Sequence, residues 1–383
     1  MLNMWQIYWK ILFSAWETYG VGIIFLRWLF FLPLFLLFTR FTLWLDKIFF
    51  AQYQQVEIKK PVFIIGNPRS GTSFLHNLLT QTDDFVSFKT WEIFFPSLTA
   101  RIFIKPIINF LTRHNLTQIM PESSGHGLYL DRVEHDEFLF VHQLDTQFLL
   151  LLSPLGYSDR EYPELRLYDQ QPDSRRYSSV RFFHDCLKRQ AYYCQKNQII
   201  AHIHFSTCRV KTLLEIFPDA KFIYLIRSPQ ETIPSHLTLE YNTFKHQNRL
   251  DNISPAKLQR YFKRRYEYDI ELYRYLHDLQ QQGEIPSQNL MVLPYQSLCI
   301  DLELAFERIV RFTQIQTSET LQQAIEQQAA KTYERQHKII DLQQFDLTHA
   351  QIEQDFDFVF EAYDFDRCDE VTEQAEAISQ VQT

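Results

Sequence analysis

The chemistry of this sequence is concentrated in a glycine-bounded turn that follows a short apolar run. Residues 62–65 are all apolar and lead into a turn that Gly66 and Gly71 enclose, after which apolar residues recur at helical spacing. The pattern predicts a strand, a tight turn and a helix N-terminus, where unpaired backbone N–H groups and the helix dipole favour an anion. We therefore expect a phosphate group to bind here, with Arg69 as the cation inside the turn.

The turn has the spacing of a Walker A loop but lacks its lysine. That motif requires lysine directly after the second glycine, and Thr72 stands there instead, followed by Ser73. The sequence also offers no convincing aspartate at the end of a strand to hold Mg²⁺. These two features argue against ATP chemistry, although a P-loop kinase or NTPase stays open as an alternative.

Two polar side chains are expected to converge near the end of the apolar run Lys221–Ile226. Arg227 leaves the end of this expected strand, and Ser235 follows eight residues later on the next helix. In α/β folds ligands bind at the carboxyl edge of a parallel sheet. Arg227 and Ser235 can therefore meet at this edge of the sheet.

The order of the expected strands and helices that position these residues predicts an α/β fold with a parallel sheet and helices on both faces. Apolar, β-rich runs alternate with helical patterns, which is typical of buried parallel strands. An amphipathic helix is expected over 301–313. The expected strands are Phe63–Ile65, Gln198–His204, Lys221–Ile226 and Leu290–Pro294.

The amino terminus, residues 1–50, is expected to associate with a membrane. Within 21–38, fifteen of eighteen residues are apolar, and tryptophans flank the stretch. This length is close to that of a membrane span, while a helix or helical hairpin in the interface is the alternative. More positive charge follows the stretch than precedes it, so the large C-terminal part is expected to be cytoplasmic.

The composition of the 383-residue chain argues against several kinds of function. A net charge of −8 argues against a general nucleic-acid binder, and five cysteines without a CxxC pair give no disulfide or metal framework. We expect a main domain over 58–365. Within it, residues 100–195 form a mainly helical insertion on the acceptor side, and residues 369–383 form a disordered tail.

The segments 66–79 and 218–237 together resemble the PAPS-dependent sulfotransferases, and weaker matches over 58–365 resemble a bacterial branch of that family. The resemblance implies a P-loop-like sulfotransferase fold. It also implies PAPS (3′-phosphoadenosine 5′-phosphosulfate) as donor, PAP as product, a hydroxyl acceptor and no required metal. The residues that it implies for the donor are Arg69, Ser70, Gly71, Thr72 and Ser73 at the 5′-phosphosulfate, and Arg227 and Ser235 at the 3′-phosphate.

The acceptor hydroxyl needs a general base, for which the sequence offers Glu92 and His204, with His202 as an auxiliary group. The related branch usually reads Lys-x-Pro-x-His where this chain has His202, His204 and Ser206. The departure leaves open a changed acceptor, a different base, or an inactive protein that binds PAP or PAPS as a membrane scaffold. Aromatic content and the apolar amino terminus suggest a lipid or other amphipathic acceptor. The run 134–137 cannot face one ion from a single helix, so no metal site is expected there.

Overall fold

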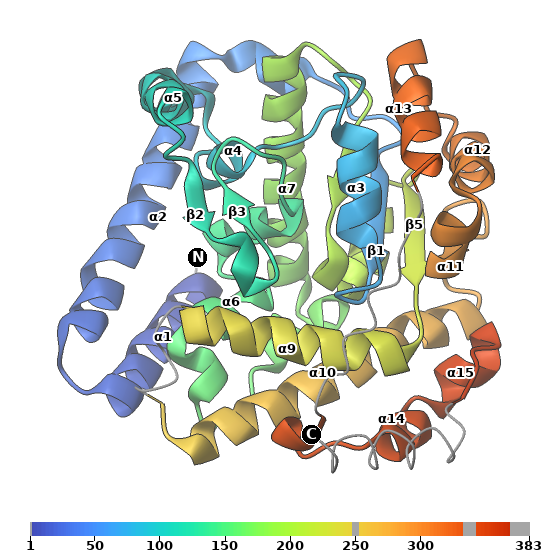
Figure 1. Cartoon of the computed structure of the whole chain (residues 1–383). Coiled ribbons are helices and arrows are strands. Elements are labelled where there is room, and N and C mark those ends of the chain that lie inside the picture. Colours follow the sequence, from blue (N-terminus) through green and yellow to red (C-terminus); the bar gives the residue numbers. More distant parts are fainter. Residues whose placement is uncertain (1, 247–252, 332–341, 368–383) are drawn as a thin grey trace.

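A computed structural model describes residues 2–246, 253–331 and 342–367, and its centre is a four-stranded sheet (Figure 1). Its order is β4-β1-β5-β6 and each neighbouring pair is parallel. The strands are β1 (Val62–Gly66), β4 (Ile200–His202), β5 (Lys221–Ile226) and β6 (Leu290–Pro294). The expected α/β fold with a parallel sheet is confirmed. The tail 369–383 lies outside the described residues.

Helices cover both faces of this sheet, and as a result every residue of β1 is buried. Phe63 and Ile65 pack into a core with α7 (Asp173–Cys194) and α10 (Pro255–Gln281). Val62 and Ile64 point the other way, into a core with α3 (Thr72–Thr80), α12 (Leu302–Thr313) and α13 (Glu319–Ala329). The continuous apolar runs in the sequence therefore reflect burial on two faces.

The remaining elements connect these layers. The segment 100–195, expected to be mainly helical, also contains a two-stranded antiparallel sheet of β2 and β3. The elements are β2 (Gln118–Met120), β3 (Leu128–Tyr129), α4 (Thr90–Phe94), α5 (Leu98–Arg113), α6 (Phe148–Leu152), α8 (Val210–Ile216), α9 (Pro229–His246), α11 (Tyr295–Ile300), α14 (His349–Asp355) and α15 (Asp357–Tyr363).

One predicted strand is too long. β4 ends at His202, and His204 is the first residue of the 3₁₀ segment η7 (His204–Arg209). The chain turns there because the backbone N–H and hydroxyl of Ser206 both donate to the buried carboxylate of Glu137. The predicted strand Gln198–His204 is therefore wrong beyond His202, and His202 and His204 do not lie on one strand.

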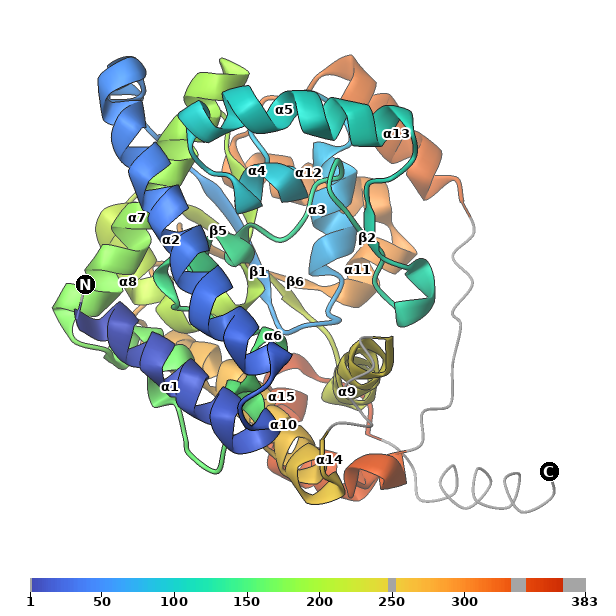
Figure 2. The same cartoon turned by 90° about the vertical axis from the view of Figure 1, so that its left-hand side faces the viewer.

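The amino terminus forms a helical hairpin of α1 (Leu2–Tyr19) and α2 (Ile23–Phe49), which lies on the same side of the molecule as α5 (Figure 2). Within the described residues, α2 is the helix that is long and apolar enough to cross a membrane. Its last turns are tied to the body, because the buried Asp46 carboxylate pairs with Arg189 at 2.9 Å. The same carboxylate accepts the N–H groups of Leu98 and Thr99 at the start of α5.

Candidate active site

The turn between β1 and α3 is packed so closely that two of its residues must be glycine. Gly66 has a φ of +146°, and a Cβ there would lie 2.5 Å from the carbonyl oxygen of Leu225 in β5. Gly71 has a φ of +92°, and a Cβ there would lie 2.5 Å from the Tyr295 ring. Arg69 is also in the left-handed region, at φ 69°. Backbone in this sparsely populated region is typical of functional turns.

The two predicted anion-binding segments meet at Arg69. Its Nε donates to Ser235 Oγ at 2.9 Å, and Arg227 Nη1 donates to the Arg69 carbonyl at 3.1 Å. The Arg227 guanidinium lies 4.3 Å from the centre of the Tyr295 ring and pairs with Glu231 at 3.1 Å. Two guanidinium groups and a hydroxyl are thus brought together from β1–α3, the end of β5, and α9.

The hydroxyl residues of the turn have different environments. Thr72 and Ser73 begin α3 and, with Gly71, line a large cavity. Ser70 is fully buried, and its hydroxyl donates to the carbonyl of Asn67 at 2.6 Å. The Ser70 hydroxyl therefore stabilises the turn from inside, whereas Thr72 and Ser73 form part of the cavity wall.

The cavity beside this turn is large and mostly apolar. Its volume is about 1470 Å³. It reaches from Arg69 and Arg227 to the apolar helix α2, whose side chains Phe31, Leu34 and Phe38 line it. Aromatic and aliphatic side chains of the inserted segment, including Phe138, Phe148 and Leu151, form further wall. One space therefore joins a cationic end to an apolar helix on the protein surface.

The structure separates the candidate bases. His204 is buried and lines the cavity, and its Nδ1 lies 3.1 Å from Nδ1 of His135. Glu92 is not among the lining residues. Its Oε2 accepts the backbone N–H of Lys89 at 2.9 Å and a side-chain N–H of Gln190 at 3.0 Å. Glu92 thus caps the first turn of α4, and His202 lies buried behind His204 at the end of β4.

Four further histidines line the cavity: His126, His135, His142 and His236. Of these, the sequence drew attention only to His135, as part of the run 134–137. Burial lowers the pKa of His135 to about 4 and the pKa of both His202 and His204 well below 6.5, so all three rings are neutral at pH 7. No pattern in the linear sequence joins these residues, because they come from segments far apart along the chain.

His236 differs from the other buried histidines because it carries charge. Burial would lower its pKa, but the carboxylates of Asp269 and Glu240 outweigh burial and raise the pKa to about 9. Asp269 Oδ2 lies 2.8 Å from His236 Nδ1, and Glu240 also pairs with Arg265 at 2.8 Å. The cavity wall beside Ser235 therefore holds a compensated network of two cations and two anions.

Comparison with known proteins gives this site a context. The Sulfotransferase family model matches residues 61–319. The omega-hydroxy-beta-dihydromenaquinone-9 sulfotransferase Stf3 of Mycobacterium tuberculosis and of Mycobacterium bovis is 28% identical over 203 residues, which cover 51% of this chain and 50% of Stf3. The chain thus spans about half the length of the curated relatives that it matches.

Solved structures of bacterial sulfotransferases share the fold. Sulfotransferase STF1 from Mycobacterium tuberculosis H37Rv aligns with a TM-score of 0.62 at 15% identity, covering 92% of each chain. Sulfotransferase STF9 from Mycobacterium avium aligns with a TM-score of 0.63 at 16% identity, covering 85% of this chain and 82% of that one. At these identities the likeness concerns the fold alone.

The charged state of His236 predicts a pH-dependent stability. Because its pKa is near 9 in the folded chain against 6.5 for an unperturbed histidine, protonation stabilises the folded state fully below pH 6.5. That stabilisation is lost as the pH rises through 9. The free energy of unfolding, measured by urea titration in detergent, should fall on the order of 3 kcal/mol over this range. His236→Asn should lack that fall; an equal pH dependence in both proteins would contradict the assignment.

Proposed function

Because the chain belongs to the sulfotransferase family, we propose that it transfers a sulfuryl group from PAPS to a hydroxyl of a lipid or other amphipathic acceptor. The observation that carries the proposal is the meeting of Arg69, Arg227 and Ser235 at one end of a large apolar cavity. The cationic end suits the donor nucleotide, and the apolar remainder suits the acceptor.

The donor would lie across the two anion-binding segments. Backbone N–H groups at the start of α3, with Arg69, Gly71, Thr72 and Ser73, would hold the 5′-phosphosulfate. Arg227 and Ser235 would hold the 3′-phosphate. Ser70 would support the turn from inside. A sulfuryl group carries less charge in transfer than a phosphoryl group, so amides and arginines can stabilise it without a metal ion.

His204 is the base that the geometry favours. Its Nδ1 faces His135, which leaves Nε2 to accept the proton of the acceptor hydroxyl. The hydroxyl oxygen then forms a bond to sulfur, the bond from sulfur to the 5′-phosphate oxygen breaks, and PAP leaves. The neutral form of His204 can accept a proton at neutral pH. His202 would be an auxiliary group behind it, and the carboxylate of Glu92 is committed to capping α4.

The lipid character of the acceptor is supported by the cavity wall. The space is larger than the 300–1,000 Å³ usual for small-molecule sites, and α2 contributes exposed apolar side chains to it: Phe31 is 61% and Leu34 64% exposed. An acceptor could therefore extend its apolar part from the base to the protein surface. The printed name of the relative Stf3 describes a menaquinone derivative as its acceptor.

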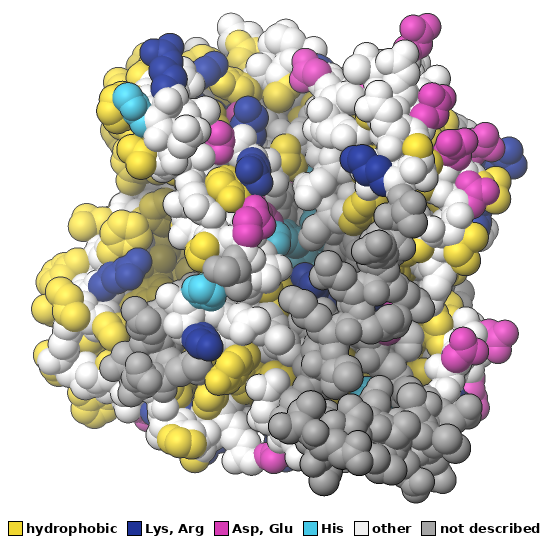
Figure 3. Space-filling view, viewed as in Figure 1, with side chains coloured by type: hydrophobic (Ala, Val, Ile, Leu, Met, Phe, Trp, Pro, Cys, Tyr) yellow, Lys and Arg dark blue, Asp and Glu magenta, His cyan; other side chains and the backbone are white. Residues whose placement is uncertain are grey.

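Association with a membrane would bring such an acceptor to the cavity. Hydrophobic side chains gather over α1 and α2 at the left of Figure 3. Helix α5 lies on the same side of the molecule (Figure 2) and carries further exposed apolar residues. We call this the apolar face, and we propose that it lies in the cytoplasmic leaflet interface. Its exposed members are Trp5, Trp9, Trp16, Leu26, Phe30, Phe31, Leu34, Leu37, Phe38, Phe41, Trp44, Ile102, Phe103, Ile107 and Phe110.

The donor assignment predicts ligand-specific stabilisation. PAP at 100 times its dissociation constant should stabilise the folded chain by about 2.7 kcal/mol, and so raise its melting temperature, while ATP should not. Arg227→Ala should lose most of this rise because it removes a 3′-phosphate ligand. Arg308→Ala, at an arginine of α12 on the other side of the fold from α9, is the matched control and should keep it. A well-folded wild type that PAP does not stabilise would contradict the donor assignment.

The base assignment predicts a loss of turnover without a loss of donor binding. His204→Gln should lower the rate of ³⁵S transfer from labelled PAPS to a lipid extract by a factor of about 10²–10⁴ and keep the melting shift with PAP. Glu92→Gln retains an oxygen that can accept the Lys89 N–H, so its rate should stay within about threefold of wild type. A larger loss from Glu92→Gln than from His204→Gln would contradict the assignment. PAP binding with no transfer by wild type would instead support an inactive donor-binding protein.

If the apolar face contacts the membrane, charged substitutions on it should weaken binding to phospholipid vesicles. Phe31→Glu combined with Leu34→Glu should reduce co-flotation with phospholipid vesicles at least tenfold, because a charge on an inserted helix costs about 3 kcal/mol. Leu304→Glu changes a leucine of α12 that is also more than half exposed, at 53%, and should float like wild type. Equal flotation of both variants would exclude the apolar face as the membrane contact.

A further inference from the structure

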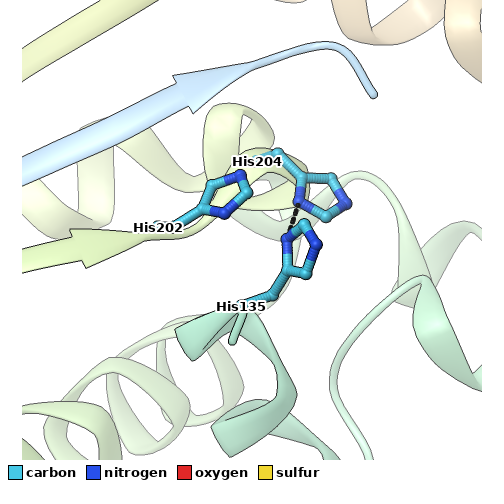
Figure 4. A group of neighbouring side chains, drawn as sticks. All are labelled: His135, His202 and His204. Atoms are coloured by element: carbon cyan, nitrogen blue, oxygen red, sulfur yellow. Dashed lines mark hydrogen bonds between the residues drawn. The ribbon is translucent and has the colours of Figure 1, made fainter. Parts of the chain in front are cut away.

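Three histidines from two distant segments converge beside the cavity. His135 precedes η3 (Asp136–Gln143), His202 ends β4, and His204 begins η7. Each offers one nitrogen, and these three nitrogens all lie within 4.8 Å of one another. Figure 4 shows the three rings turned toward a common centre, with Nδ1 of His135 and Nδ1 of His204 3.1 Å apart.

The three imidazoles are shielded from water. His202 is 1% and His204 4% exposed, and the His135 side chain is 14% exposed. Imidazole nitrogen is a common ligand of metal ions in proteins. Nε2 of His202 is buried and has no hydrogen-bond partner among the described residues. Such an atom is costly to leave unpaired, which points to a missing ligand.

We propose that His135, His202 and His204 bind a divalent zinc-class cation, with a fourth coordination position open to the cavity. Zinc binds histidine nitrogen at about 2.0–2.1 Å, so two nitrogen ligands of a tetrahedral ion lie roughly 3.3 Å apart. The observed 3.1 Å between the two Nδ1 atoms is close to this value. His135 and His204 both line the cavity, which gives the ion access to it.

A carboxylate supports the cluster from behind. Glu134 Oε1 lies 3.1 Å from Nε2 of His135, the nitrogen turned away from His204. Both carboxylate oxygens of Glu134 also lie 3.1 Å from Nε2 of His126, which fixes the position of the group. A histidine that binds zinc commonly donates its second N–H to a carboxylate, which orients the ring. Glu134 would be this positioning residue.

The ion would regulate the transfer reaction, a consequence that rests on the proposed function. When Nδ1 of His204 binds the cation, Nε2 carries the ring proton and cannot take the proton of an acceptor hydroxyl. The metal-bound protein would therefore lack its base. Zinc acts as an inhibitor in this proposal, and the transfer itself needs no metal.

The test is direct measurement of zinc binding to the full chain in detergent, with any affinity tag removed and metal stripped by a chelator. Calorimetric titration with ZnCl₂ should give one equivalent per chain, and metal analysis after dialysis should agree. His202→Asn and His204→Asn should each weaken binding at least tenfold, and Glu134→Gln should weaken it about 10–100-fold. His114→Ala removes an exposed histidine that is not part of the cluster, and this variant should bind zinc like wild type.

Two further readouts keep the test decisive. Melting curves of each variant establish that it folds, and visible absorption of the Co²⁺-substituted protein should report tetrahedral coordination in wild type that His202→Asn lacks. Absence of stoichiometric zinc in wild type, or unchanged binding in folded His202→Asn and His204→Asn, would overturn the proposal. Zinc binding is measured without PAPS. A result of one zinc ion per chain would therefore support the metal site even if PAP failed to stabilise the chain.

Discussion

The close contact between a glycine turn and the neighbouring strand governs the arrangement of this site. Gly66 touches the backbone of β5 at Leu225, two residues before Arg227, so the turn and the arginine cannot be far apart. Gly71 touches the Tyr295 ring, on which the Arg227 guanidinium also rests. Any side chain at either glycine would push these three segments apart. The parallel order of β1, β5 and β6 thus brings Arg69, Arg227 and Tyr295 together at one edge of the sheet.

Burial also sets the charge of the histidines along the cavity. His202 and His204 become neutral, whereas His236 stays charged between Asp269 and Glu240. Neutral His204 can therefore accept a proton, while the carboxylates beside His236 compensate its charge. The apolar hairpin of α1 and α2 closes the space, held at its end by the buried Asp46–Arg189 pair.

Much of the fold, and the meeting of the two candidate anion-binding segments, could be predicted from the sequence. Buried parallel strands produce continuous apolar runs, so the ranges of β5 and β6 match the expected ones. The family resemblance singled out Arg227 and Ser235, and the geometry of a strand end and the next helix brings both close to Arg69. The domain limits and the roles of the site residues stay predictions.

The approach of His135 to His202 and His204 could not be predicted, because it depends on contacts between segments far apart in the chain. His135 belongs to a run whose local spacing excludes a metal site, and its partners come from residues 67 and 69 positions later. His204 leaves the expected strand because Ser206 turns to Glu137, and Glu92 turns to the backbone of Lys89. Side-chain direction after a strand end, or at a helix cap, is decided by such tertiary partners.

The central claim is that the glycine turn and the β5–α9 segment bind opposite ends of one sulfuryl donor. A crystal structure of the full chain with bound PAP tests it most directly. The account predicts the 5′-phosphate at the start of α3 beside Arg69, and the 3′-phosphate between Arg227 and Ser235, with Arg69 released from Ser235. PAP bound with neither phosphate at these groups would contradict it.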